Sequence, residues 1–422
     1  MTIRLDSVCP IDAPHERESL AISAGRIVSR ELPPPDHAES PLGGSRLALS
    51  GFLNTHTHLP MVLLRGRAED LPLSIWLRDH IWPLERRLTP DDVYWGALLA
   101  IAEGIRSGVT TYADMYFHCD AIAQAVEESG VRALLAYGMV APSIAEGGRE
   151  EISKARRFVD RWQGRADGRI RTAVAPHAVY TCGEDVWRES IDLAQDRSVP
   201  IHTHVAETRG EVDDWKAKTG LSPVAWLERI GALHVPALLA HCVHVDADDI
   251  ALLASDQVTV AHCPKSNAKL GSGIAPIAAM LAAGVRVSLG TDGAASNNRQ
   301  DMLEEQRATW LLQRAFHQSA TEVSSQDLVT MSSRNGRQVL GLPDSGLTEG
   351  APGDVVLLQT GITELAEHRQ VEAWLAFEAV ACDVTDVYVN GHPLLQCGEL
   401  QTIDEEKVRY EVRHRTRRIT GT

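Results

Sequence analysis

Two histidines stand one residue apart in FLNTHTHLP, residues 52–60, a segment that otherwise reads as an apolar strand. Side chains at positions i and i+2 of a β-strand project from the same face of the sheet. His56 and His58 can therefore direct two imidazoles at one point, and imidazole is a common ligand of zinc. The pair predicts a metal site, but it does not say what the metal does.

Further polar residues follow other apolar runs along the chain. His204 lies in HTHVAET with Glu207 three residues later, and Asp292 lies in LGTDG. His177 and His241 close two more runs, in VAPH and LLAH. Three imidazoles and one carboxylate suit a catalytic zinc, whose open position binds a water with a pKa lowered towards about 7. Any one of these residues alone would more often be structural, so the prediction depends on the whole set.

The runs before these residues must bring them together. Short apolar runs alternate with amphipathic stretches, a pattern that predicts parallel strands covered by helices. Eight such runs predict a (β/α)8 TIM barrel, in which functional groups gather at the C-terminal ends of the strands. The predicted strands are residues 48–56, 109–116, 131–139, 170–177, 199–207, 237–243, 258–264 and 285–292.

Turn and cap signals complete the predicted organisation. Thr89 and Pro90 predict the start of a helix that ends before Gly108. Short strand-like pieces in residues 1–48 and 346–422 predict a small discontinuous β-sandwich, built from both chain ends and followed by a charged terminal helix. The barrel would then comprise residues 49–345, and the Pro-rich stretch 31–44 would be a loop.

Composition limits the possible partners. The formal net charge is −16 at pH 7, which disfavours nucleic acid and anionic membranes and favours a small-molecule substrate. No signal peptide or apolar run of about 18 residues is visible, so we expect a cytoplasmic protein. The seven cysteines never form a CxxC spacing, which argues against disulfides and a thiolate zinc site. We expect them to be reduced and buried.

The motifs together resemble the amidohydrolase superfamily, and more narrowly its 5'-methylthioadenosine/S-adenosylhomocysteine deaminase group. They occur in the family's order from about residue 50 to 345: GFLNTHTHLPMVLLRG, LPLSIWLRDHIWPLE, APHAVYTC, HTHVAET, AHCVH, AHCPKSNAKLGSGIAP and LGTDGAASNN. The resemblance implies one Zn²⁺ per subunit, or iron or manganese in its place, held by His56, His58, His204 and Asp292. One ion is implied because His177 stands where dinuclear members carry a bridging lysine.

The resemblance also implies catalytic roles. Asp292 would take a proton as metal-bound hydroxide attacks C6 of a purine, and His241 would orient that nucleophile. Glu207 would protonate the ring nitrogen. His177 and Glu207 would contact the substrate, as would three further residues: Trp76 beside the base or sugar, Glu85 at the ribose hydroxyls, and Arg149 near a charged substrate tail.

The implied function is zinc-dependent deamination of adenosine derivatives such as 5'-methylthioadenosine, S-adenosylhomocysteine and adenosine, giving the inosine analogue and ammonia. The alternative is a triazine amino- or chlorohydrolase, or a guanine-type free-base deaminase, neither of which needs Trp76, Glu85 and Arg149. A barrel retained only as a scaffold would not need Glu207 with a full ligand set. Family habit suggests a homo-oligomer.

Some residues receive other interpretations. Trp82 fits a helical spacing and is interpreted as a core residue. Asn267 and Ser296 are interpreted as residues that shape loops. Ala206 replaces a bulkier residue of some superfamily members, and we expect it to alter the wall of the substrate pocket.

Overall fold

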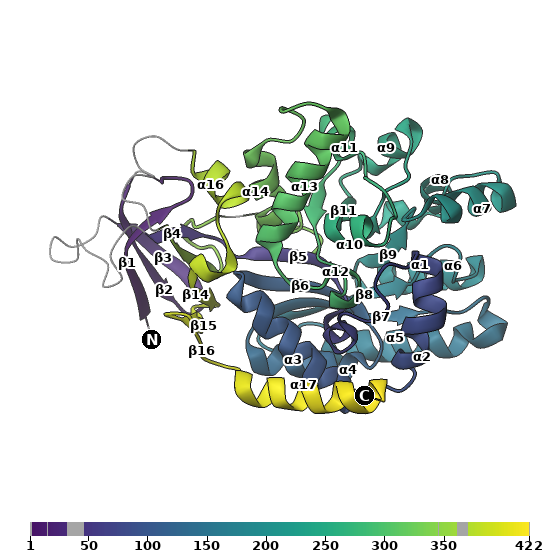
Figure 1. The fold of residues 1–422 in the computed structure, drawn as a ribbon, viewed down its shortest axis with the longest axis horizontal. Helices are drawn as coiled ribbons and strands as arrows, with labels where there is room; N and C mark the ends of the chain where they lie inside the picture. The colour runs from purple at the N-terminus through teal and green to yellow at the C-terminus, as the bar shows by residue number, and fades with distance from the viewer. Residues whose placement is uncertain (1, 15, 32–45, 345, 361–369, 422) are drawn as a thin grey trace.

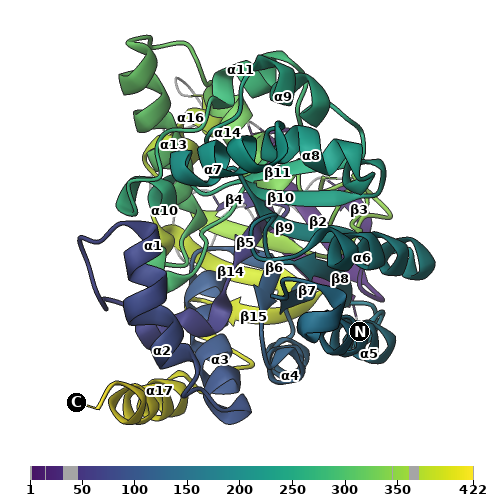
Figure 2. The same cartoon turned by 90° about the vertical axis from the view of Figure 1, so that its right-hand side faces the viewer.

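The computed structural model describes residues 2–14, 16–31, 46–344, 346–360 and 370–421. Its larger unit is a nearly closed barrel of eight parallel strands, each paired with its neighbours in chain order (Figures 1 and 2). The prediction of a (β/α)8 barrel is therefore confirmed. The strands are β5 (Phe52–Thr57), β6 (Val109–Tyr116), β7 (Arg132–Met139), β8 (Ile170–Pro176), β9 (Ile201–Val205), β10 (Ala237–His241), β11 (Val258–His262) and β12 (Val287–Leu289).

Helices follow the strands and surround them (Figure 2). Those of the outer layer are α3 (Pro90–Arg106), α4 (Cys119–Ser129), α5 (Arg149–Trp162), α6 (Glu184–Arg197), α7 (Arg209–Thr219), α8 (Pro223–Arg229), α9 (Ala247–Leu253), α10 (Pro264–Lys269), α11 (Ile277–Ala282), α13 (Met302–His317) and α14 (Ser325–Ser333). Shorter turns follow β5, β7, β9 and β12: η2 (Leu59–Leu64), α1 (Leu73–Ile75), the π-helical η3 (Trp76–Ile81), α2 (Trp82–Glu85), η4 (Ile144–Gly148), η5 (Ala232–His234) and α12 (Ala294–Asn297).

A second sheet is built from both ends of the chain (Figure 1). Its strand order is β16 (Glu399–Leu400), β15 (His392–Gln396), β14 (Val384–Val389), β13 (Val355–Gln359), β4 (Arg46–Leu49), β1 (Thr2–Pro10), β2 (Glu18–Ser23) and β3 (Arg26–Glu31). Strand β4 joins the two halves, because it pairs in parallel with β1 and antiparallel with β13. The predicted sheet from both chain ends is confirmed, whereas the domain limits at 48/49 and 345/346 stay a prediction.

The first barrel strand differs from the prediction, which joined residues 48–56 into one strand. Ala48 belongs to β4 of the second sheet, and the barrel strand begins at Phe52. Between them, a Cβ added to Gly51 would lie 2.1 Å from Thr110 Cγ2, so the chain passes too close to β6 for any larger residue. The predicted Pro-rich loop lies outside the described residues, apart from Glu31 at the end of β3.

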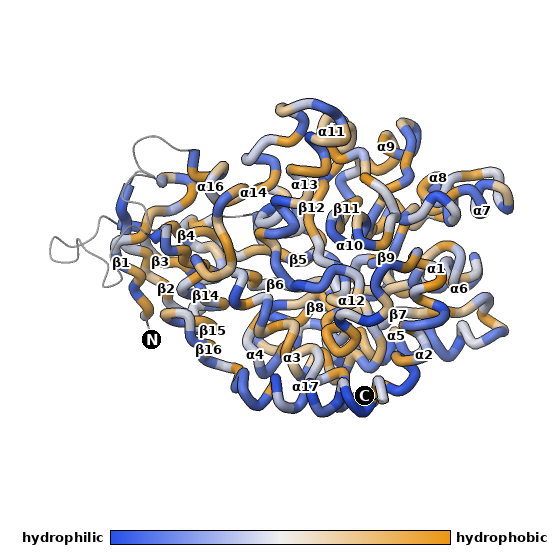
Figure 3. The backbone as a smooth tube through the Cα atoms, viewed as in Figure 1, coloured by the Kyte–Doolittle hydropathy of each residue, from blue (hydrophilic) through white to orange (hydrophobic). Residues whose placement is uncertain are grey.

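The barrel interior is filled by small and branched apolar side chains contributed by the strands. Figure 3 shows hydrophobic residues concentrated along the strands, while α17 (Glu405–Thr420) is mostly hydrophilic. The edge strands β5 and β12 close the barrel through Thr55, whose hydroxyl donates to the carbonyl of Leu289 at 2.8 Å. A Cβ on Gly290 would lie 2.8 Å from the backbone nitrogen of His56, so only glycine permits the chain after β12 to pass this close to β5.

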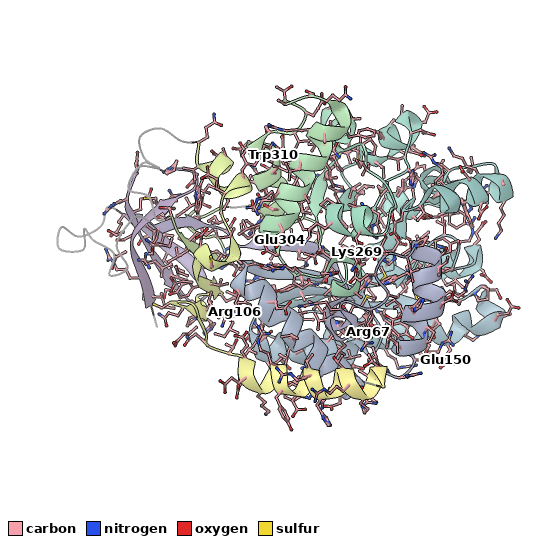
Figure 4. The ribbon with its side chains drawn as sticks, viewed as in Figure 1. Arg67, Arg106, Glu150, Lys269, Glu304 and Trp310 are labelled. Atoms are coloured by element: carbon pink, nitrogen blue, oxygen red, sulfur yellow. The ribbon has the colours of Figure 1, made fainter. Side chains whose placement is uncertain are left out.

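The remaining helices connect the sheet to the barrel. Helix α16 (Val371–Phe377) and the turn η6 (Ala381–Asp383) precede β14, and α17 runs back along α3 (Figure 1). Arg106 near the end of α3 pairs with Glu405 at 2.5 Å (Figure 4). The predicted charged terminal helix is therefore present, and its buried positions Val408, Val412 and Ile419 supply the apolar contact.

Two further expectations concern cysteines and membranes. All seven cysteines are free, but only five are buried; Cys382 and Cys397 are exposed, so the expectation of burial is wrong for these two. Within the part of the chain that the structure describes, the helices are too short or too polar to cross a bilayer.

The predicted start of α3 provides a test of the fold. The Thr89 hydroxyl accepts from the Asp92 N–H at 3.3 Å, and the Asp92 carboxylate accepts from the Thr89 N–H at 2.8 Å, forming a capping box. Thr89→Ala should lower the free energy of unfolding by about 1 kcal/mol, measured by urea denaturation. The exposed Thr321→Ala is the control, and equal stability of the two variants would contradict the capping role.

Candidate metal centre and active site

Four side chains meet at the C-terminal end of the barrel. His56 lies near the end of β5 and His58 directly follows it, His204 lies in β9, and Asp292 follows β12. One possible ligand atom from each of the three histidines lies within 4.8 Å of the others. Asp292 Oδ1 lies 3.2 Å from His58 Nε2 and 3.6 Å from His56 Nε2, and the Nε2 atoms of His58 and His204 are 3.4 Å apart.

The other ring nitrogen of each histidine is held in place. His58 Nδ1 donates to the carbonyl of Met115 at 2.5 Å, and His204 Nδ1 donates to that of His177 at 2.9 Å. His56 Nδ1 lies 2.9 Å from His202 Nε2. Because the Nδ1 proton of His58 and His204 is committed to a carbonyl, their Nε2 atoms present lone pairs to the shared point.

These residues fit a metal ion. Four ligands at the usual zinc distances stand about 3.3 Å from one another in a tetrahedron, and three of the pairs here are 3.2 to 3.6 Å apart. His56 Nε2 is buried and has no hydrogen-bond partner among the described residues, an arrangement that a metal would satisfy. Burial, and then the charges of neighbouring histidines, lowers the pKa of His56 and His204 well below the usual range, so both are neutral ligands.

Asp292 is held by a network of its own. Its Oδ2 accepts hydrogen bonds from the hydroxyls of Ser266 at 2.6 Å and Ser296 at 2.9 Å, and its Oδ1 accepts from the Gly293 N–H at 2.7 Å. Burial acts to raise the pKa of Asp292, but the charges of His58 and His241 and these hydrogen bonds lower it overall. Asp292 is therefore an ionised carboxylate at neutral pH.

Backbone strain accompanies the site. Asp292 has a φ of 61° and His241 a φ of 74°, in the left-handed region that non-glycine residues rarely adopt. Ala206, which precedes Glu207, has a φ of 51°. Such conformations cost of order 1–3 kcal/mol each and are kept where the surrounding structure fixes a functional geometry. They turn the side chains that follow the strands towards the barrel mouth.

Glu207 and His241 face each other beside the ligand cluster. Glu207 Oε2 lies 3.8 Å from His241 Nε2, and its Oε1 accepts from the Ser272 hydroxyl at 3.2 Å. Burial raises the pKa of Glu207, which favours the protonated carboxyl. His241 Nδ1 lies 2.9 Å from Asn267 Oδ1 and donates to it, so Nε2 is the nitrogen turned to Glu207.

A cavity of about 580 Å³ opens above these residues. Its floor contains His58, His204, Asp292, Glu207 and His241, and its walls are largely apolar: Met61, Leu73, Leu77, Leu88, Phe117, Val140, Tyr180 and Leu270. This is the shape expected of a small-molecule site, in which apolar walls surround a few convergent polar groups. A flat heterocycle of moderate size fits such a volume.

Three of the predicted substrate residues line this cavity. Trp76 is buried, and its indole N–H has no hydrogen-bond partner among the described residues. Glu85 accepts from the Tyr116 hydroxyl at 2.6 Å through Oε1. His177 lines the wall, and burial lowers its pKa to about 4, so it is neutral at pH 7. Arg149 is exposed at the start of α5 and does not line the cavity, and its predicted contact with substrate stays a prediction.

Three other interpretations need correction. Trp82 is 39% exposed and lines the cavity, so it is not a core residue. The prediction assumed regular α-helical spacing, but the turn before Trp82 is π-helical, which rotates Trp82 to a different face. Asn267 and Ser296 do more than shape loops, because they bond to His241 and Asp292. Ala206 is buried away from the cavity and does not form its wall.

Several supporting residues were missed from the sequence. His202, Ser266, Ser272 and Tyr116 each contact a predicted site residue through one hydrogen bond. Only His202 carried a usable signal, since it stands two residues before His204 and therefore on the same face of β9. Arg86 also lines the cavity, as the one arginine there. Arg86 stands among other charged residues in the sequence, and no pattern there separated it from surface arginines.

The sequence and the fold were compared with those of known proteins. Residues 47–394 match the amidohydrolase family. A 5-methylthioadenosine/S-adenosylhomocysteine deaminase of Pelotomaculum thermopropionicum is 43% identical over 380 residues, covering 90% of this chain and 87% of the relative. A 5'-deoxyadenosine deaminase of Methanothermobacter thermautotrophicus is 42% identical over 394 residues, covering 93% and 92%. The crystal structure of an adenosine deaminase from Xanthomonas campestris with bound zinc is 34% identical, with a TM-score of 0.90 and coverage of 100% and 98%.

The contact between His202 and His56 gives a test of the metal centre. Burial lowers the pKa of His202 to about 3, so its ring is neutral at pH 7. If His56 directs the Nε2 lone pair at a metal, its Nδ1 carries the proton and donates it to His202 Nε2, 2.9 Å away. His202→Phe keeps a ring but removes the acceptor, and it should weaken zinc binding by about 10- to 100-fold, measured by competition with a chelator.

A matched control is His262→Phe. His262 is equally buried, and both of its ring nitrogens lack a hydrogen-bond partner among the described residues. This variant should bind zinc as the unchanged protein does. Equal zinc affinity of the His202 and His262 variants, both folded by circular dichroism, would show that His202 does not position His56.

Proposed function

The chain belongs to the amidohydrolase family and is a hydrolytic enzyme, and from this premise we propose that it deaminates adenosine derivatives at a single zinc ion. The observation that carries the proposal is the pairing of two oppositely tuned carboxyl groups, Glu207 and Asp292, at the floor of one apolar cavity. Hydrolytic deamination needs a base to take a proton from water and an acid to protonate the heterocycle.

The proposed metal would be held by His56, His58, His204 and Asp292. When bound, zinc supplies Lewis-acid activation of a water molecule at neutral pH. This donor set of nitrogen and oxygen atoms suits iron or manganese as well. The buried cysteines Cys242 and Cys263 take no part in the donor set.

Proton transfer is assigned to the chain's own carboxyl groups. Asp292, ionised at neutral pH, accepts a proton from the attacking water through its carboxylate. Glu207, whose pKa is raised by burial, holds a proton and donates it to the purine ring nitrogen beside C6. The proton on Asp292 then passes to the departing amino group, which leaves as ammonia, and the hydroxyl proton at C6 returns to Glu207 as the C6 carbonyl forms. The product is the inosine analogue.

The imidazoles of His241 and His177 are assigned to orientation. Asn267 fixes the ring of His241, so Nε2 is directed at the water and at the oxygen that develops charge during attack. The neutral ring of His177 lies against His204, with ring centroids 4.6 Å apart, and forms one side of the cavity. Its place suits contact with the edge of the heterocycle.

The cavity walls support a nucleoside rather than a free base. The indole N–H of Trp76 is available to an acceptor on the sugar or base. Glu85 uses Oε1 for Tyr116, which leaves Oε2 for a ribose hydroxyl. Arg86 is the arginine of the cavity wall and takes the place that Arg149 was predicted to hold near a charged 5'-substituent. The apolar side chains around it suit a methylthio group.

A substrate panel tests the proposal. The zinc-loaded protein is incubated with 5'-methylthioadenosine, 5'-deoxyadenosine, adenosine, S-adenosylhomocysteine, guanine and melamine, and ammonia release is measured alongside ultraviolet absorbance. We expect turnover of the adenosine derivatives and little release from guanine or melamine. Ammonia from guanine or melamine with none from any nucleoside would replace this proposal with the free-base or triazine alternative.

Glu207→Gln tests the assigned acid. The amide cannot donate the proton, so turnover should fall by about 10²- to 10⁴-fold, the usual contribution of general acid catalysis. Zinc content should stay unchanged, because Glu207 is not a proposed ligand. Glu228→Gln, at a surface residue 2.9 Å from His234, is the control. Near-normal turnover in Glu207→Gln would remove this residue from the mechanism.

A further inference from the structure

A second cavity, of about 720 Å³, lies at the opposite end of the barrel from the candidate active site. It is lined by residues near the N-terminal ends of β6, β7 and β8, including Thr111, Arg132 and Arg171. The second sheet forms the facing wall through residues of β3, β14 and β15, among them Arg26 and His392. The metal centre stands beyond the C-terminal ends of the same barrel strands, so the two cavities are separate.

The lining of this second cavity is strongly cationic. Four arginines line it, whereas Asp167 is the one acidic residue among its lining side chains. The chain as a whole has a net charge of −16, so this concentration of positive charge is opposite in sign to the average surface. A concave, cationic surface attracts anions and raises their local concentration.

Two of the arginines already have partners that explain their positions. Arg132 is buried and forms a double hydrogen bond with Asp354, at 2.6 and 3.0 Å. Arg26 donates to the carbonyl of Gly350 at 2.7 Å. These contacts connect the second sheet to the barrel and fix the walls of the cavity.

The other two arginines contact no carboxylate among the described residues. Arg169 donates to three backbone carbonyls, those of Val126, Glu127 and Val131. The side chain of Arg171 has no hydrogen bond or ion pair with another residue of the described part of the chain; only its backbone pairs with β7. A Cβ added to Gly341 would lie 2.3 Å from Arg171 Nη1, so the guanidinium lies directly against this backbone.

Like charges also crowd at this place. Burial, and then the charge of Arg132, lowers the pKa of Arg169. Asp354 offsets the charge of Arg132, and Asp167 and Glu127 act on Arg169 in the same sense. Arg171, which stays charged at neutral pH, has no such carboxylate contact among the described residues. Arg169 and Arg171 also stand on either side of Ile170 at the start of β8, so both extend from one rigid element.

We propose that this cavity binds a phosphate-bearing anion, recognised by Arg169 and Arg171 with Arg26 beside them. The planar forks of guanidinium groups match the oxygens of phosphate and bind them through paired hydrogen bonds. The volume exceeds that of inorganic phosphate alone and lies in the range of small-molecule sites. The ligand therefore has room for a sugar attached to the phosphate. This site is independent of the proposed deamination.

Isothermal titration calorimetry on the zinc-loaded, full-length protein tests the proposal, with orthophosphate and ribose 5-phosphate as the two probes. We expect saturable binding at one site per chain, weakening as salt concentration rises. Arg171→Gln and Arg169→Gln should each weaken binding about tenfold or more, since each removes hydrogen bonds to a charged group. Arg165→Gln, at an exposed arginine outside the cavity, should change nothing. Tighter binding of ribose 5-phosphate would identify a phosphorylated sugar as the ligand class.

Three results would overturn the proposal. The first is no heat of binding for either probe. The second is equal affinity in the Arg171→Gln variant, whose exposed side chain makes it the substitution least able to disturb folding. The third is displacement of the bound anion by 5'-methylthioadenosine, which would place the anion at the metal centre. Deaminase activity without added anion should be unchanged in Arg171→Gln.

Discussion

The structure depends on the hydrogen bonds that connect metal-directed residues to neighbouring strands of the barrel. His58, directly after β5, donates to Met115 on β6, and His204 on β9 donates to the residue that follows β8. The Asp292 N–H, after β12, donates to the carbonyl of His56 on β5 at 2.8 Å. The contact that closes the barrel is thus also a contact that sets the ligand geometry. A shift in strand register would separate the ligands.

Environment divides the chemistry between two carboxyl groups. Glu207 has few hydrogen-bond donors and is buried, which raises its pKa, whereas Asp292 receives three hydrogen bonds and faces histidine charges, which lower its pKa. Glu207 therefore suits the role of acid and Asp292 the role of base within a single cavity. The left-handed backbone at Asp292 and His241 is the cost of directing these side chains inward.

The sequence predicted the barrel because it follows from local patterns, and the structure brings the three histidines of the predicted ligand set together. Strand β6 matches its predicted limits of 109–116, because a short, continuous apolar run between two helices predicts a buried strand. The later strands are shorter than predicted: β12 covers only Val287–Leu289, because Asp292 turns away from the sheet at a positive φ. The supporting hydrogen bonds of Ser266 and His202 join elements far apart in the chain, and no local pattern records such pairings. No local pattern indicated the π-helical turn that begins at Trp76 or the exposure of Trp82 either.

The zinc K-edge X-ray absorption spectrum of the zinc-loaded protein tests the central claim, that three imidazoles and one carboxylate hold a single ion. The account predicts nitrogen and oxygen neighbours at about 2.0 to 2.2 Å, with the outer-shell scattering of about three imidazole rings. A sulfur neighbour at about 2.3 Å would contradict the ligand set. A second metal at about 3.5 to 4 Å would contradict the single ion.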